Sequence, residues 1–218
     1  MDKVVIFGAG RHAELVGYEM DFYNLHEVVA YTVQSVFLDK EKLNGLPVVP
    51  YETLTETYPP ETYKMFVAVG PQAVNGVREN LYKDSKEKGY SFVNCICPSP
   101  TISENIKIGE NVYIDVVSMF SRFVEIGNNV VVISSQVGHH CKIGDNCFIS
   151  GSILAGNITI ENNVFIGLGS AVGPNITLGE KTVVGMGCSI SKNTVPASVY
   201  INQSTQKQKF DSSKLKLL

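Results

Sequence analysis

The sequence predicts a small α/β domain followed by an all-β parallel solenoid. The prediction rests on three observations. Strand-like apolar runs alternate with helical patterns up to about residue 96, and from Thr101 one apolar residue recurs every six residues. Half of these recurring residues are followed directly by glycine. We expect domains at 1–96 and 97–196, with a closing strand and tail at 197–218.

The first domain is expected to be a small parallel sheet, because its strands are separated by helices that act as crossovers. β-Branched and apolar runs predict the strands, and apolar residues at helical spacing among polar ones predict the helices. The proline-containing segment 36–60 is expected to be mostly loop around one short helix. The predicted strands are "KVVIF", "EVVAYTV", "KMFVAVG" and "YSFVNCI", and the predicted helices span 11–22 and 74–88.

The second half repeats with a period of six, which fits neither a helix, with its period of 3.6, nor a simple strand, with its period of 2. A hexapeptide repeat predicts a β-solenoid in which each repeat forms one short strand and one turn, and three repeats close one coil. About five coils result, more than the three or so that a repeat array needs. The inward-pointing positions are Ile102, Ile108, Ile114, Phe120, Ile126, Val132, Val137, Ile143, Ile149, Leu154, Ile160, Ile166, Val172, Leu178, Val184 and Ile190.

The composition excludes several classes of protein. The net charge is −3 with 18% charged residues and no basic stripe, which argues against a nucleic-acid partner. The five cysteines show no CxxC pairing, so we expect them to be reduced and buried, as in a cytoplasmic protein. The N-terminus lacks the pattern of a signal peptide, and no apolar run approaches the length of a membrane span, so membrane insertion is not expected.

Beyond the repeat, the stretches "VVIFGAGRHAELV", "FVAVGPQAVNGVRENL", "VGHHCKIGDNCFI" and "LAGNITIENNVFIG" resemble the hexapeptide-repeat sugar acyltransferases. The match is to the group of sialic acid O-acetyltransferases and nucleotide-amino-sugar N-acetyltransferases, and it covers residues 3 to about 200. The resemblance implies a left-handed β-helix and a homotrimer. It also implies that the α/β domain holds a nucleotide-linked sugar, while acyl-CoA lies between neighbouring solenoids.

The resemblance places the catalytic base at His139, in the motif "GHH". A nucleophile that attacks a thioester must lose a proton, and histidine is a suitable general base. The family often has a carboxylate at the next position, where this chain has His140, a candidate modulator. The coil register stacks His139 between Arg122 and Gly156. Because side chains alternate along a strand, we expect the two imidazoles to point in different directions.

Asn157 is a candidate for orienting the His139 ring in place of the missing carboxylate. Two adjacent histidines also raise the question of a metal site, since carbonic anhydrases share this type of solenoid. A zinc site of that kind uses three imidazoles. The repeat half has only His139 and His140, so we expect no metal.

The first strand ends in a GxGxxA turn, which lets the backbone approach a phosphate at the N-terminus of a helix. A tight strand-to-helix turn alone would also explain the glycines. No acidic residue stands at 31–33, after the second strand, and this disfavours NAD. The resemblance instead assigns the turn to a nucleotide-sugar. The contacts that it implies are Gly8, Gly10, Arg11, His12 and Gly70.

For acyl-CoA, the resemblance indicates small and apolar residues along the solenoid edge, each of which corner packing would also explain. Surface lysines in the last quarter of the chain could meet the CoA phosphates, although solvated lysines are the alternative. The residues assigned to acyl-CoA are Phe148, Gly156, Leu168, Ser170, Met186 and Gly187, and the lysines are Lys192, Lys207 and Lys209.

These observations together predict an acyltransferase that uses acyl-CoA, in the first instance acetyl-CoA, to N-acylate a nucleotide-linked amino sugar in bacterial surface-glycan synthesis. Two alternatives stay open. One is O-acetylation of a sugar hydroxyl, sialic acid included, because nothing in the chain separates nitrogen from oxygen as the attacking atom. The other is a catalytically silent sugar-binding solenoid.

Overall fold

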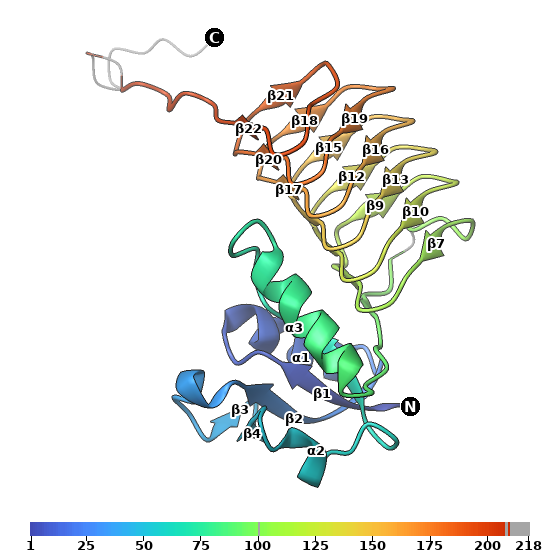
Figure 1. The fold of residues 1–218 in the computed structure, drawn as a ribbon. Helices are drawn as coiled ribbons and strands as arrows, with labels where there is room; N and C mark the ends of the chain where they lie inside the picture. Colours follow the sequence, from blue (N-terminus) through green and yellow to red (C-terminus); the bar gives the residue numbers. More distant parts are fainter. Residues whose placement is uncertain (100, 208, 210–218) are drawn as a thin grey trace.

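The computed structural model describes residues 1–99, 101–207 and 209, and it places a small α/β domain beneath a β-solenoid (Figure 1). In the α/β domain, β1 (Lys3–Phe7) pairs in parallel with both β2 (Glu27–Val33) and β5 (Lys64–Val67). The crossover helix α1 (Arg11–Phe22) buries one face against this sheet. The predicted small parallel sheet with helical crossovers is therefore confirmed.

The segment 36–60 differs from the prediction of a mostly irregular loop. It contains a hairpin of β3 (Lys42–Leu43) and β4 (Leu46–Pro50), and β4 continues the parallel sheet beside β2, in the order β3-β4-β2-β1-β5. A 3-10 turn η1 (Ser35–Phe37) and helix α2 (Leu54–Thr57) complete it. The prolines led to a wrong prediction, because Pro47 and Pro50 lie near the two ends of β4, where a missing N–H removes little of the ladder.

The solenoid has three parallel sheets, and each coil contributes one short strand to each sheet, in the manner of the predicted left-handed β-helix. The seven-stranded sheet, the domain-facing sheet, contains β6 (Cys95–Ile96), β8 (Tyr113–Ile114), β11 (Val131–Ile133), β14 (Phe148–Ser150), β17 (Phe165–Ile166), β20 (Val183–Val184) and β22 (Val199–Tyr200). The second sheet contains β9 (Met119–Phe120), β12 (Gln136–Val137), β15 (Ile153–Leu154), β18 (Ala171–Val172) and β21 (Ser189–Ile190). The third contains β7 (Lys107–Ile108), β10 (Glu125–Ile126), β13 (Lys142–Ile143), β16 (Thr159–Ile160) and β19 (Thr177–Leu178).

The inward-pointing positions form the solenoid core as the period of six predicts. All of them are buried except Ile102 and Ile108, which are partly buried and pack against the same core. Strand partners hold the register from coil to coil; Ile126 pairs with Ile143, and Ile143 with Ile160. The five cysteines are free and buried, also as predicted.

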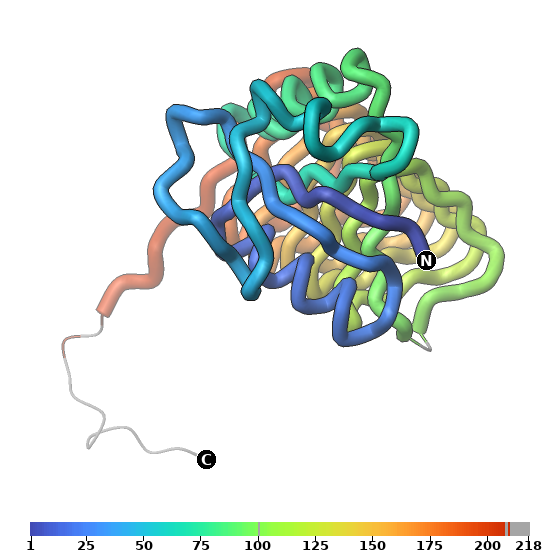
Figure 2. The backbone as a smooth tube through the Cα atoms, turned by 90° about the horizontal axis from the view of Figure 1, so that it is seen from below, coloured from blue at the N-terminus to red at the C-terminus, as the bar shows by residue number. Residues whose placement is uncertain are grey.

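The two domains share an extensive interface. Phe92 forms only a single bridge to β5, and the chain then passes into β6, which pairs with β8 of the solenoid and not with the α/β sheet. Outward-pointing residues of β8, β11 and β14 pack into the core of the α/β domain. Seen from below, this domain lies across the coils (Figure 2).

Helix α3 (Gly76–Glu87) lies along one corner of the solenoid, where the third sheet turns into the domain-facing sheet (Figure 1). Arg78 is fully buried there and donates hydrogen bonds to the backbone carbonyls of Asn129, Asn146 and Cys147. Asn75, at the N-cap of the helix, donates to the carbonyl of Asn163. The helix thus crosses several coils and fixes the α/β domain to them. None of the helices in the described part of the chain has the length and apolar character needed to cross a bilayer.

Candidate active site

His139 and His140 lie in the turn between β12 and β13, at the corner that joins the second and third sheets; we call this the histidine corner. His140 has a φ of 58°, in the left-handed region. The strict alternation of side chains holds only along a strand, and it ends at this turn. The expectation that the imidazoles point in different directions was therefore wrong, since the two rings contact each other.

The neighbouring coils shape the space around His139. A Cβ atom on Gly156, one coil further, would come within 2.7 Å of the His139 Cε1 and Nε2 atoms, so glycine leaves room for the imidazole. On the other side, Arg122 and Phe123 join both histidines in lining a cavity of about 700 Å³. The structure thus brings together the stack of Arg122, His139 and Gly156 that the coil register predicts.

A direct contact joins the two imidazoles. Their Nδ1 atoms lie 3.0 Å apart, and the ring planes are nearly perpendicular, at 84°. The Phe123 ring lies against His140, with centroids 4.8 Å apart. Asn157 does not contact the His139 ring: its side-chain amide donates to Asn175, and its backbone N–H donates to the carbonyl of His139.

The residues assigned to acyl-CoA fall in three places. Gly156 belongs to the histidine corner, whereas Leu168 and Met186 lie at the corner between the domain-facing and second sheets, with exposed fractions of 53% and 70%. Ser170 is buried beside them and donates to the carbonyl of Gly185, while Gly187 has a φ of 70°.

The second sheet therefore spans the distance from the histidine corner to Leu168 and Met186. Phe148 lies elsewhere, on the outer face of β14 against the α/β domain, where it stacks on Phe165 at 5.9 Å. The lysines of this set, Lys192, Lys207 and Lys209, are exposed.

The residues assigned to the nucleotide-sugar come together in one cavity of about 680 Å³, which Gly8, Gly10, Arg11, His12 and Gly70 all line. We call it the glycine-turn cavity. At Gly8, with a φ of 131°, a Cβ would lie 2.7 Å from the carbonyl oxygen of Ala68, so the turn requires glycine.

His12 forms the inner wall of the glycine-turn cavity. It packs edge-on against the ring of Tyr113, and its Nε2 atom is buried without a hydrogen-bond partner among the described residues. Burial, with a further contribution from the Arg78 cation, lowers the pKa of His12 to about 4. The imidazole is therefore neutral at neutral pH.

Sequence reasoning missed one wall of the glycine-turn cavity, which is formed by Gln34, Phe37, Asp39 and Lys40. Lys40 donates from Nζ to the Ala9 carbonyl at 3.0 Å and so lies across the glycine turn. An acidic residue was sought directly after β2, at 31–33, whereas Asp39 lies beyond the turn η1. A search that allowed for an intervening turn would have found it.

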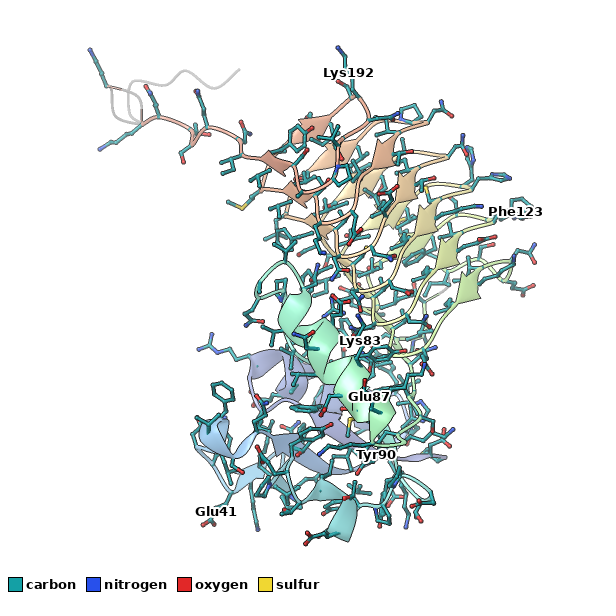
Figure 3. The ribbon with its side chains drawn as sticks, viewed as in Figure 1. Glu41, Lys83, Glu87, Tyr90, Phe123 and Lys192 are labelled. Atoms are coloured by element: carbon teal, nitrogen blue, oxygen red, sulfur yellow. The ribbon has the colours of Figure 1, made fainter. Side chains whose placement is uncertain are left out.

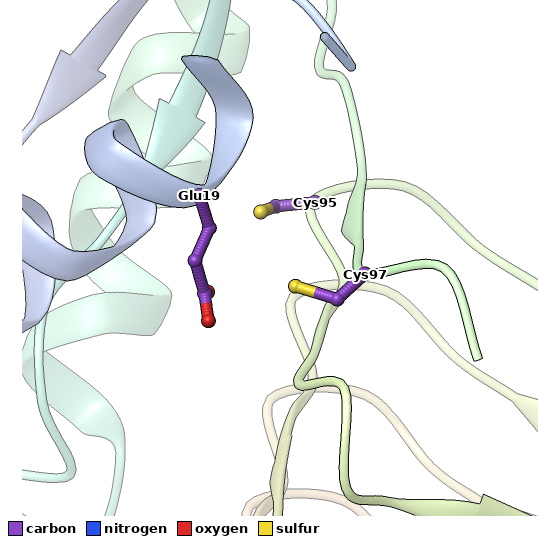
Figure 4. Close-up of side chains that lie close together, drawn as sticks. All are labelled: Glu19, Cys95 and Cys97. Atoms are coloured by element: carbon purple, nitrogen blue, oxygen red, sulfur yellow. The ribbon is translucent and has the colours of Figure 1, made fainter. Parts of the chain in front are cut away.

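One further cluster of metal-ligating groups lies in the domain interface. The side chains of Glu19, Cys95 and Cys97 converge, and one ligand atom from each lies within 4.8 Å of the others (Figure 4). Glu19 already accepts a hydrogen bond from Tyr113, and a hydrogen bond with Cys97 together with burial raises the pKa of the Cys95 thiol. Metals bind thiolates, and a raised pKa disfavours the thiolate of Cys95, so this internally bonded cluster is better explained as interface packing.

Within one chain, the histidine corner and the glycine-turn cavity lie on different sides of the solenoid. The α/β domain packs on the domain-facing sheet, whereas the histidine corner joins the other two sheets. Figure 3 shows Phe123, the neighbour of His140, at an outer corner far from the α/β domain.

Comparison with known proteins places this fold among sugar acetyltransferases. A perosamine N-acetyltransferase from Caulobacter crescentus, solved with CoA and GDP-perosamine as a variant with one histidine replaced by asparagine, matches 93% of this chain and 94% of its own chain. The TM-score is 0.84 and the identity 27%. The acetyltransferase domain of PglB from Neisseria gonorrhoeae has the same fold, with a TM-score of 0.80 over 91% of this chain and 96% of its own at 24% identity.

The curated proteins give a shorter match. An acyl-carrier-protein-dependent UDP-N-acetylglucosamine O-acyltransferase from Sinorhizobium fredii is 36% identical over 80 residues, which is 33% of this chain. The match spans 30% of the length of that protein. No protein-family model matches the chain. The structural matches confirm the resemblance to the hexapeptide-repeat sugar acyltransferases and the fold that the motifs predict, and they support an acyltransferase activity for this chain.

Proposed function

We propose that this protein transfers an acyl group, in the first instance acetyl, from acyl-CoA to the amino group of a nucleotide-linked deoxysugar. The observation that carries the proposal is the pairing of the histidine corner with the glycine-turn cavity on one fold. The similar protein from Caulobacter binds both CoA and GDP-perosamine on that fold. Such a product would serve bacterial surface-glycan synthesis such as that of O-antigen, and the free, buried cysteines favour a cytoplasmic location.

The chemistry assigned to each residue follows from the geometry. Gly8 and Gly10 let the backbone approach the diphosphate of the acceptor, and Arg11 supplies a positive charge beside it. The sugar amine attacks the thioester carbonyl, and His139 accepts the amine proton as the C–N bond forms. The C–S bond then breaks, and the CoA thiolate takes up that proton. General-base assistance of this kind is typically worth about 10²–10⁴-fold in rate.

The proposal requires a neighbouring copy, because one chain holds its acceptor cavity and its base on different sides of the solenoid. The second sheet and its edge towards the domain-facing sheet expose apolar side chains that a neighbouring solenoid could cover. These are Val117, Met119, Ile153, Leu168 and Met186, with exposed fractions of 44–70%. We therefore propose a homotrimer in which His139 of one subunit acts on a sugar held by the next.

The test is thiol release from acetyl-CoA with UDP-, dTDP- and GDP-linked 3-amino and 4-amino deoxysugars, with free sialic acid as comparison. His139→Ala is assayed beside His26→Gln, which changes a histidine of the α/β domain outside both sites. Release with one amino sugar, lost only in His139→Ala, is the expected result. Turnover of sialic acid alone would replace N-acylation by O-acylation.

Two other outcomes would overturn parts of the proposal. Release that persists in His139→Ala would remove His139 as the base. No release with any acceptor, despite binding of both CoA and a nucleotide-sugar, would leave a silent sugar-binding solenoid. The trimer is tested separately by sedimentation, in which a monomer active at high dilution would contradict a site shared between subunits.

A further inference from the structure

We propose that His140 is the positioning residue of the catalytic base: its Nδ1 atom accepts a hydrogen bond from Nδ1–H of His139 and so leaves the Nε2 lone pair of His139 free for the acceptor. The inference rests on the proposed function, and it assigns to a neutral imidazole the task that a carboxylate performs in a His–acid pair. The observation behind it is the 3.0 Å separation of the two Nδ1 atoms.

The contact between the two rings restricts which of their nitrogens can carry protons. A neutral imidazole carries one proton, so one of its nitrogens donates and the other accepts. Two Nδ1 atoms at hydrogen-bond distance need one proton between them. Either His139 carries it on Nδ1 and keeps Nε2 as a base, or His140 carries it and forces the proton of His139 onto Nε2. Only the first arrangement leaves His139 able to take a proton from the acceptor.

The surroundings of His140 hold its ring beside that of His139. Its left-handed backbone turns the side chain back towards His139, and its backbone N–H donates to the Arg122 carbonyl at 3.1 Å. The Phe123 ring, tilted by 37°, packs against one face of the imidazole. The other candidate for orienting His139 is already engaged, because the Asn157 amide donates to Asn175 at 2.8 Å.

His139 has its second nitrogen available. Nε2 makes no hydrogen bond with any described residue, while Nδ1 is held by His140. When Nε2 takes the acceptor proton, the imidazolium keeps its Nδ1–H bond to His140, so the ring does not need to rotate during the reaction. An imidazole at this position, unlike a carboxylate, orients the ring without adding a negative charge that would stabilise the imidazolium.

The first experiment reads the tautomers directly in the resting enzyme, and so does not depend on knowing the acceptor. The full chain is labelled with ¹⁵N at histidine, and long-range ¹H–¹⁵N correlation near neutral pH separates protonated from unprotonated ring nitrogens. With four histidines in the chain, single substitutions assign the signals. We expect His139 protonated at Nδ1 and His140 protonated at Nε2. The opposite pair of tautomers would overturn the proposal, whatever the activity assay shows.

The second experiment uses substitutions that tolerate the left-handed backbone. His140→Gly removes the acceptor and His140→Asp restores one. Lys181→Gly is the matched control, because Lys181 is an exposed solenoid residue with a φ of 57° that belongs to neither site. We expect His140→Gly to lower kcat about 10-fold or more with both KM values kept, a smaller loss than that of the base itself.

His140→Asp should recover most of that activity, and Lys181→Gly should leave kcat unchanged. In His140→Gly the His139 tautomers should also become mixed. An unchanged kcat in His140→Gly, or a loss that His140→Asp does not relieve, would refute the positioning role. In either case, N-acylation by His139 would still be judged by the thiol-release assay.

Discussion

Two corners of the solenoid have the same left-handed backbone conformation, but one corner is buried and the other is exposed. At the corner covered by helix α3, left-handed asparagines stack from coil to coil and are almost fully buried; they are Asn111, Asn129, Asn146 and Asn163. The histidine corner has left-handed residues in the same register, but it is exposed; these residues are Phe123, His140, Asn157 and Asn175. We call the first the asparagine corner.

The difference lies in what covers each corner. At the asparagine corner the side-chain amides form hydrogen bonds from coil to coil: Asn111 donates to Asn129 at 2.7 Å, and Asn129 donates to Asn146 at 2.8 Å. Arg78 of α3 donates to the backbone carbonyl of Asn146 beside them. No helix of the described residues covers the histidine corner, which faces a cavity. A left-handed turn can therefore contribute to stability where a helix buries it, and it can present a reactive side chain to a cavity where it is exposed.

The largest expected effect comes from removing the buried cation of the asparagine corner. Arg78 is fully buried, and burial lowers its pKa to about 10, so it remains charged at neutral pH. Arg78→Ala leaves the buried carbonyls of Asn129 and Asn146, on two neighbouring coils, without donors and should lower the free energy of unfolding by about 3–5 kcal/mol.

Urea denaturation measures this effect. The control is Lys83→Ala, on the same helix, where the lysine makes only an exposed ion pair with Glu79 and should cost below about 0.5 kcal/mol. Equal losses in the two variants would show that α3 does not stabilise the solenoid through its corner.

Low pH should reduce the free energy of unfolding through His12. This residue lies where the α/β domain covers the solenoid, near Arg78 and against Tyr113. Burial holds the pKa of His12 at about 4, below its value of 6.5 in the unfolded chain, so the unfolded state binds more protons between these values. The stability contribution is complete above pH 6.5 and is lost as the pH falls towards 4. At pH 4.5 the loss should be about 2–3 kcal/mol.

Denaturation curves of the wild type and His12→Gln at pH 7 and pH 4.5 test this dependence. The variant has no imidazole at this position and should lose correspondingly less stability in acid. An acid-induced loss of the same size in both proteins would place the sensitivity elsewhere.

The smallest effect is also the most direct test of the two corners. Asn129→Ala and Asn175→Ala impose the same backbone strain, since both residues have a positive φ, of 56° and 60°. Asn129→Ala also leaves two buried amide partners unpaired, so it should cost about 1–3 kcal/mol more than Asn175→Ala. Differential scanning calorimetry measures the difference, and equal melting temperatures would mean that coverage by α3 contributes nothing.

The solenoid could be predicted from sequence because its cause is local. Each coil must bury one apolar side chain per strand, so the period of six appears directly in the chain, and the stacking of His139 on Gly156 follows from counting along it. Strand β4 was missed for the opposite reason. Its prolines are tolerated because they lie near the two ends of the strand, and the sequence alone does not show where the strand begins and ends.

The candidate site could be predicted only in part. The motif located His139 and the glycine turn, but the contact between the imidazoles depends on the left-handed φ of His140, which a rule of alternating side chains does not describe. Arg78 was read as one of the charged residues among the apolar positions of a helix. Its burial depends on a corner more than 50 residues later in the chain, which no local pattern reports.

The route of helix α3 also determines how the molecule opens. The side-chain hydrogen bonds between α3 and the solenoid extend from the coil of Glu110 to that of Asn163, while among the described residues β18 to β22 pair only with strands of neighbouring coils. In a one-dimensional stack, each coil is only as stable as its own interfaces. Local unfolding should therefore begin at the C-terminal coils and stop at the coils that α3 contacts. The turn of His139 lies within the part of the solenoid that α3 contacts. The arrangement of the two histidines should therefore persist when the C-terminal coils unfold.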